Sequence, residues 1–181
     1  IFADVMNKVP KGDIGVAVSG GGDSLALLYL SADWALINNR TLKVATIDHR
    51  LRSESTVECE YVKKISGQLS IEHTTLTWFE KPPGNIQKQA RDARHRLLTN
   101  WAIDKNLSVV LLGHNLEDNA ETIMIRLIRG SGVDGLAGMS QYKKINNLGI
   151  FRPLLKVKRE ELRVYLTEKN ISWVEDPSNF D

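Results

Sequence analysis

The segment AVSGGGDS, residues 17–24, decides the fold of this chain. It joins the apolar run IGVAV at residues 14–18 to the apolar run DSLALLYLSADWALI at residues 23–37. The first run has the length and β-branched residues of a buried strand, and the second has the length of a buried helix. Three glycines let backbone N–H groups approach an anion closely, and the N-terminus of the next helix adds partial positive charge. These features favour a phosphate-binding turn from strand to helix.

An acid stands where many phosphate-binding loops carry a lysine. The pattern GxxxxGK[ST] places Lys before the final hydroxyl, but this chain has Asp23 before Ser24. For the glycines alone, a plain strand-to-helix turn in which the helix dipole favours Asp23 stays an alternative. The arrangement S-G-G-x-D-S after an apolar strand resembles the PP-loop of the ATP pyrophosphatase superfamily. That resemblance implies ATP and Mg²⁺ as cofactors, with Asp23 helping to hold the cation among the phosphates.

Strands and helices alternate along the rest of the chain. We expect further strands at residues 42–48, 71–78 and 108–113. We expect further helices at residues 53–69, 86–104, 117–129 and 158–169. This alternation is typical of an α/β domain, and we predict a mostly parallel, five-stranded sheet with helices on both faces. Ligands of such sheets bind beyond the carboxyl ends of the strands.

Composition bounds the function only loosely. Of the 181 residues, 42% are apolar and 25% are charged, as in ordinary globular domains, and the net charge of +2 neither requires nor excludes a nucleic acid. One cysteine, Cys59, excludes an internal disulfide and a multi-cysteine metal site. No apolar run approaches the ~20 residues of a membrane span, so we expect no membrane partner and a cytoplasmic protein. Because the chain begins at Ile1 rather than Met, we expect a piece of a longer protein.

Two acids lie on one side of the helix expected at residues 117–129. Asp118 and Glu121 are three positions apart near its start. Paired acids beside a phosphate loop suit Mg²⁺ or a substrate amine, although the helix dipole alone also favours acids there. For Glu117 we adopt that second interpretation. We expect the opposite side of the helix to pack on the sheet through Ala120, Ile123, Met124 and Leu127.

Five blocks of sequence resemble the tRNA(Ile)-lysidine synthetase family. The longest is GHNLEDNAETIMIRLIRGSGVDGLAGM at residues 113–139, which is similar to the family's H-x-x-D-D-Q-x-E-T…R-G-S-G-x-x-G-L-x-x-M. The others are IDHRLRSES (47–55), GNIQKQARDARHRLL (84–98), RPLLKVKREEL (152–162) and WVEDPSN (173–179). The chain departs from the family pattern at Glu117, Asn119 and His95, where the family usually has Asp, Gln and Tyr.

The resemblance implies a two-step reaction on an isoleucine tRNA with a CAU anticodon. ATP adenylates the C2 oxygen of the wobble cytidine and releases pyrophosphate, and the amino group of L-lysine then attacks C2 and expels AMP. We assign residues 1–181 to the catalytic PP-loop domain. Within it, residues 150–181 are a peripheral segment leading toward a further, tRNA-gripping domain of the kind the family carries. Among the partners of the chain, a second copy of itself in a homodimer stays open.

The resemblance also gives roles to individual residues. The ATP-binding residues are Ser19, Gly20, Gly21, Gly22, Asp23, Ser24, Asp48, His49, Gly113 and His114. The catalytic residues are Asp23, Arg91, Arg94, Asp118 and Glu121, and the metal ligands are Asp23 and Asp118. The residues for lysine or cytidine are Asp118, Glu121, Arg129, Ser131 and Gly132. The residues for the tRNA backbone are Arg152, Lys156, Lys158 and Arg159.

Other interpretations of these residues stay open. Asp48 equally fits a cap, His49 a structural hydrogen-bonding residue, and Arg91 with Arg94 a solvated basic face. Other functions also stay open, namely a tRNA thiolation enzyme or a nucleotide-binding module without catalysis. One cysteine is too few for thiolation enzymes that carry a metal cluster, and loss of the acids would favour the binding module, whereas here they are present.

Overall fold

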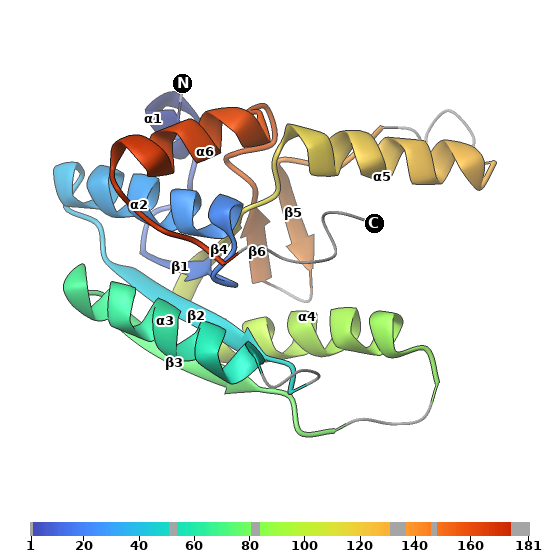
Figure 1. The fold of residues 1–181 in the computed structure, drawn as a ribbon, viewed down its shortest axis with the longest axis horizontal. Helices are drawn as coiled ribbons and strands as arrows, with labels where there is room; N and C mark the ends of the chain where they lie inside the picture. Colours follow the sequence, from blue (N-terminus) through green and yellow to red (C-terminus); the bar gives the residue numbers. More distant parts are fainter. Residues whose placement is uncertain (1, 51–53, 81–83, 131–136, 146–147, 175–181) are drawn as a thin grey trace.

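The computed structural model describes residues 2–50, 54–80, 84–130, 137–145 and 148–174 (Figure 1). Its strands are β1 (Asp13–Ala17), β2 (Leu42–Asp48), β3 (Glu72–Thr77), β4 (Leu107–Leu112), β5 (Tyr142–Ile145) and β6 (Leu148–Phe151). Its helices are α1 (Phe2–Met6), α2 (Gly22–Ile37), α3 (Glu54–Gln68), α4 (Ile86–Asp104), α5 (Leu116–Ile128) and α6 (Arg159–Glu168). None of the helices in these ranges is long and apolar enough to cross a membrane.

The strands form one sheet in the order β3-β2-β1-β4-β6-β5. Neighbouring strands pair in parallel from β3 to β6, and β5 pairs antiparallel with β6. The predicted α/β class with a mostly parallel sheet is confirmed. The expected number of five strands was wrong, because the described residues form six. The β5–β6 hairpin has only a weak sequence signal, since its strands are four residues long and β5 (YKKI) carries the lysines of an exposed edge strand.

Helices bury apolar residues against both faces of the sheet. Val109 and Leu111 of β4 join the cluster that α2, α3 and α6 cover. Val110 and Leu112 join the cluster that α4 covers on the other face. Successive residues of β4 therefore point to opposite sides, as expected for a strand covered on both. Trp101 of α4 is 4% exposed and belongs to the second cluster.

Helix α5 extends away from the sheet (Figure 1), although we expected its apolar side to pack there. None of the described residues of α5 is buried, and Met124 and Leu127 are each 61% exposed. The expectation was wrong because α2, α6 and α4 already cover the two faces beside β4. The helical period separates the apolar from the charged side chains of α5, but it does not determine what the apolar side contacts.

Helix α6 packs along α2, and this packing fixes the position of Arg159, the first residue of α6. Leu162 and Leu166 of α6 are buried in the same cluster as Leu25 and Leu28 of α2. The chain reaches α6 from β6, which pairs with β4. The first residues of α2, α5 and α6 therefore meet beyond the carboxyl ends of β1 and β4, as the contacts described next confirm.

Candidate functional site

The carboxyl ends of β1 and β4 place two loops in contact. Their parallel pairing sets Ala17 opposite Leu112, so the loop after β1 runs beside Gly113. A Cβ atom on Gly113 would lie 3.1 Å from the Cα atom of Ser24, which leaves no room for a larger residue. The structure thus brings together Gly113 and Ser24, two residues of the expected ATP-binding set.

The glycine-rich loop is held in shape by its two serines. The Oγ atoms of Ser19 and Ser24 lie 3.0 Å apart, and the Ser24 hydroxyl donates to the carbonyl of Gly21 at 2.9 Å. The backbone N–H of Ser19 donates to the Ser24 Oγ atom at 3.1 Å. Gly20 has φ +94°, a conformation that favours glycine. Because α2 begins at Gly22 behind a glycine cap, no side chain of the cap covers its positive end.

A strap of three residues, Ser172 to Val174, crosses the loop, and we had given these residues no role. The backbone N–H of Val174 donates to the carbonyl of Gly20 at 3.1 Å. The indole ring of Trp173 lies beside Gly22, 3.4 Å from where a Cβ atom would be. The Tyr61 hydroxyl of α3 donates to the carbonyl of Ser172. The strap therefore ties the loop to α3 from the far end of the described chain.

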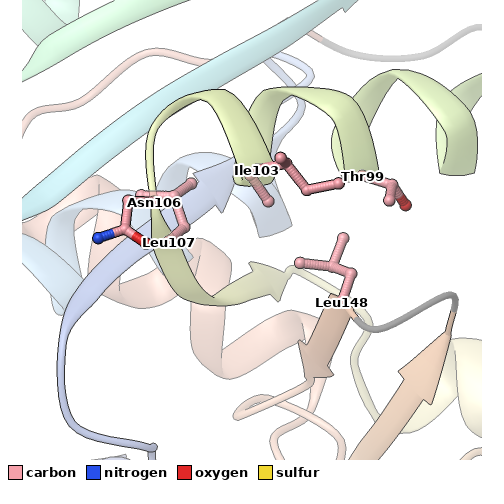
Figure 2. Close-up of a pocket in the computed structure, with 6 residues that line it drawn as sticks. Thr99, Ile103, Asn106, Leu107 and Leu148 are labelled. Carbon is pink, nitrogen blue, oxygen red and sulfur yellow. The ribbon is translucent and has the colours of Figure 1, made fainter.

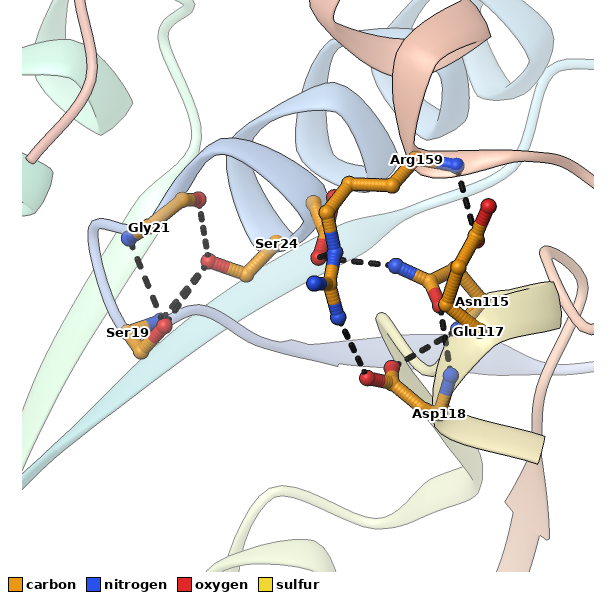
Figure 3. Close-up of polar contacts among 8 residues, drawn as sticks. Ser19, Gly21, Ser24, Asn115, Glu117, Asp118 and Arg159 are labelled. Atoms are coloured by element: carbon orange, nitrogen blue, oxygen red, sulfur yellow. Dashed lines mark hydrogen bonds and ion pairs between the residues drawn. The ribbon is translucent and has the colours of Figure 1, made fainter. Parts of the chain in front are cut away.

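Four side chains form a polar network beside the loop (Figure 3). The Nδ2 group of Asn115 donates to Oδ2 of Asp23 at 2.9 Å. Arg159 donates from Nη2 to Oδ1 of Asp118 at 3.0 Å, and its Nε lies 3.5 Å from Oδ2 of Asp23. Burial raises the pKa of Asp23, Arg159 opposes this shift, and the nearby charge of Asp118 adds to it. One arginine therefore joins the two acids that we expected to hold a metal.

Asp118 also builds the first turn of α5. Its backbone N–H donates to Oδ1 of Asn115, and its Oδ2 accepts from the backbone N–H of Asn115, both at 2.9 Å. Asn115 is completely buried, and Glu117 accepts from the backbone N–H of Arg159 at 2.9 Å. We did not single out Asn115 from the sequence, although an Asn three positions before an acid is a signal of a helix start. Both oxygens of Asp118 are thus engaged.

The residues at the end of β2 have structural contacts. Asp48 is 5% exposed, and its Oδ1 accepts from the backbone N–H of Arg50 at 2.9 Å. This contact agrees with the alternative interpretation of Asp48 as a capping residue. The ring of His49 meets Trp78 edge-on with the centroids 6.1 Å apart, and burial lowers the pKa of His49. In the described part of the chain, no hydrogen-bond partner reaches the buried Nδ1 atom of His49. Burial therefore disfavours the charged form of His49.

His114 and Arg152 form a pair behind the start of α5. The Nε group of Arg152 donates to Nδ1 of His114 at 3.2 Å, and its Nη1 donates to the carbonyl of Ser140 at 2.9 Å. Burial first, and then the charge of Arg152, lowers the pKa of His114 to about 4. Arg152 is only 8% exposed. We expected it to contact the tRNA backbone, but its Nε and Nη1 groups donate inside the protein.

The two arginines of α4 act on the site from a distance. Arg91 and Arg94 are exposed. Their charges add to the effects of burial and Arg152 in lowering the pKa of His114. A basic side of α4 thus lies within electrostatic reach of His114, at the carboxyl end of β4.

Several expected site residues are not brought into the network. Glu121 is exposed one turn beyond Asp118 on α5. Arg129 is the cap at the far end of the helix, about 17 Å from Asp118 by helical rise. Lys156 and Lys158 are exposed just before α6. Ser131 and Gly132 lie outside the described residues.

A pocket elsewhere in the structure is separate from this site. It is lined by Thr99, Ala102, Ile103, Asn106, Leu107 and Leu148 (Figure 2). Because Leu107 begins β4, this pocket lies at the opposite end of the strand from Gly113.

The acids of the network fit Mg²⁺ only together with phosphate. Among the described residues, no group of three His, Cys, Asp or Glu side chains could hold a metal. Mg²⁺ is commonly bound through one or two carboxylates plus substrate phosphates. Asp23 and Asp118 supply two carboxylates beside a loop and a helix start suited to phosphate, so the residues present meet that requirement.

A nucleotide-binding loop at the carboxyl edge of a parallel sheet defines the class of this protein, and comparison with known families agrees. The chain matches the PP-loop domain over residues 2–181 and belongs to that family of ATP-binding domains. It is 44% identical over 167 residues to the tRNA(Ile)-lysidine synthase of Orientia tsutsugamushi, covering 92% of this chain and 38% of the relative. It is 45% identical over 173 residues to the tRNA(Ile)-lysidine synthase of Ruegeria pomeroyi, covering 95% and 41%. The chain thus spans less than half the length of these relatives.

A solved structure supports the fold. The U34-tRNA thiolase NcsA from Methanococcus maripaludis superposes with a TM-score of 0.81 at 21% identity, covering 97% of this chain and 65% of that one. Identity at this level shows the common fold alone.

Proposed function

We propose that this chain is the ATP-binding catalytic part of a tRNA(Ile)-lysidine synthase. The reaction is adenylation of C2 of the wobble cytidine in a CAU anticodon, followed by attack of L-lysine and loss of AMP. The observation that carries the proposal is the likeness to two such synthases at 44% and 45% identity, which covers 92% and 95% of this chain. The juxtaposition of a phosphate loop and two acids supports it.

The loop and α2 bind the phosphates in this proposal. The backbone N–H groups at the start of α2 and the hydroxyl of Ser19 donate to phosphate oxygens, while Ser24 contributes by holding the loop in shape through its bond to Gly21. Asp23 and Asp118 would hold Mg²⁺, which would neutralise charge on the phosphates. Gly113 allows the close approach of β4 to the loop. Trp173 keeps the loop covered on the side of the strap.

The attacking amine must lose a proton and be held near C2. Glu121 is exposed one turn beyond Asp118, so its carboxylate is available to the ammonium group of lysine and to the proton it sheds. Arg91 and Arg94 stabilise negative charge that develops on the phosphate or on the activated base. The resemblance also assigns Arg129, Ser131 and Gly132 to lysine or cytidine; because Arg129 lies about 17 Å from Asp118 by helical rise, it would contact a part of the tRNA distant from the two acids.

Contacts with tRNA fall to the exposed lysines before α6. Lys156 and Lys158 are exposed and meet the tRNA backbone, where contacts give affinity without reading sequence. Arg152 and Arg159 do not join them, since their guanidinium groups point into the protein.

The test is release of AMP from α-labelled ATP by the full-length protein with Mg²⁺. L-Lysine and an isoleucine tRNA with a CAU anticodon are added separately and together. We expect repeated release of AMP only when L-lysine and the tRNA are both present. The Asp118→Asn variant should lose this release of AMP. The Glu160→Gln variant, on the exposed face of α6, serves as the matched control and keeps it. Turnover that needs tRNA and a sulfur donor but ignores lysine would replace the proposal with thiolation.

A further inference from the structure

The first residue of α6, Arg159, occupies a position that its place in the sequence did not indicate. Its guanidinium lies between two acids from different elements, 3.5 Å from Asp23 on α2 and 3.0 Å from Asp118 on α5. The side chains of all three residues are about one quarter exposed. A cation therefore already bridges the two carboxylates that the proposed function assigns to Mg²⁺.

A divalent cation on Asp23 would lie close to the positive charge of Arg159. Mg²⁺ binds carboxylate oxygen at about 2.1 Å, so a Mg²⁺ ion on Oδ2 of Asp23 would lie no more than about 6 Å from the Arg159 Nε, which is 3.5 Å from that oxygen. Charges of the same sign at this separation repel, and most strongly where the surroundings are partly buried. Asp118 is affected likewise, because its Oδ1 accepts from Arg159 while its Oδ2 holds the start of α5.

The contacts of Arg159 allow the side chain to leave while the helix stays. Its backbone N–H donates to Glu117 at 2.9 Å, which ties the start of α6 to α5 whatever the side chain does. Among the described residues, no group accepts a hydrogen bond from its buried Nε atom, so the contact with Asp23 is an ion pair without a hydrogen bond. The guanidinium is thus held mainly through Nη2 and Asp118.

We propose that Arg159 is an internal counter-ion that competes with Mg²⁺ for Asp23 and Asp118. Binding of the metal requires the guanidinium to turn away from Asp23, while α6 keeps its place. Arg159 is then a positioning residue. It lowers the affinity of the site for metal and fixes the positions of Asp23 and Asp118 relative to each other. This inference rests on the Mg²⁺ site of the proposed function.

The test is the affinity of the full-length protein for Mn²⁺, measured by electron paramagnetic resonance. An ATP analogue that cannot be cleaved between the α- and β-phosphates is present throughout. We expect Arg159→Gln to bind Mn²⁺ about three- to tenfold more tightly than the wild type, the range given by the loss of two partly exposed ion pairs. Arg159→Lys keeps one charge but cannot bridge two acids, so its affinity should fall between those of the wild type and Arg159→Gln.

The matched control is Arg163→Gln. Arg163 is exposed one turn along α6 and acts on Asp23 only through space, so its loss should change Mn²⁺ affinity less than twofold. Equal or weaker Mn²⁺ binding by both Arg159 variants would overturn the inference. The Asp23→Asn variant separates the two proposals. If wild-type Mn²⁺ binding does not depend on Asp23, the metal site itself is wrong, whereas dependence on Asp23 without an effect of Arg159 refutes the competition alone.

Discussion

Asn115 links the start of α5 to the phosphate loop, and its removal tests how the site is held together. Its Oδ1 accepts from the backbone N–H of Asp118, and its Nδ2 donates to Asp23, both at 2.9 Å. The side chain is completely buried. Loss of a helix cap costs about 1 kcal/mol, and loss of a hydrogen bond to a carboxylate costs about 1.5 kcal/mol at a partly exposed site. We therefore expect Asn115→Ala to lower the free energy of unfolding by about 2.5 kcal/mol.

Another asparagine in the chain provides the matched control. Asn85 caps α4, where its side chain accepts from the backbone N–H of Lys88 at 3.1 Å, but it is exposed. Asn85→Ala should cost only the cap, about 1 kcal/mol. Urea unfolding of both variants, followed by circular dichroism, gives the two free energies. If Asn115→Ala costs no more than Asn85→Ala, the bond to Asp23 contributes nothing and the reasoning fails.

Three further predictions concern His114, Trp173 and Gly113. Because the pKa of His114 is lowered to about 4 in the folded chain, stability should fall by up to about 3 kcal/mol as pH drops from about 6.5 to 4. His114→Gln should flatten that part of the pH profile, and an unchanged slope would contradict a half-buried, neutral His114 ring. Trp173→Ala should weaken binding of an uncleavable ATP analogue about fivefold in calorimetry, through lost packing on the loop, and unaltered affinity would exclude a role for the strap. Gly113→Ala should lower the free energy of unfolding by about 1–3 kcal/mol, because its Cβ would meet backbone at the start of α2. Gly67→Ala in α3, where a Cβ meets open space, should instead raise it by up to about 1 kcal/mol; equal effects would argue against the tight approach.

Local sequence patterns were enough for most of the fold. The apolar run before the glycines became β1, and the expected helix at residues 86–104 matches α4 (Ile86–Asp104). These segments carry their own signal, because period and caps are local properties. The β5–β6 hairpin has short strands and an exposed edge, so its pattern is weak. The packing of α5 depends on what else covers the sheet, which no local pattern contains.

The site residues also divide into those that local sequence patterns predict and those that depend on tertiary packing. Ser19 to Ser24 and Gly113 could be placed together because parallel strands bring their carboxyl ends to one edge. The contacts of Arg159 and Trp173 could not be derived from the sequence, since they depend on α6 packing along α2 and on the strap returning over the loop. Arg152 was expected to contact the tRNA backbone, which would place it at the surface. Its burial follows from its position directly after β6, against His114.

The most direct test of the central claim is mass spectrometry of nucleosides from the treated tRNA. The full-length protein is incubated with ATP, Mg²⁺, L-lysine and an isoleucine tRNA with a CAU anticodon, and the wobble nucleoside is isolated. We expect a cytidine carrying lysine at C2, which disappears when Asp118→Asn replaces the wild type or when lysine is withheld. An unmodified cytidine in the complete reaction, or a nucleoside that has gained sulfur instead of lysine, would contradict the proposed function.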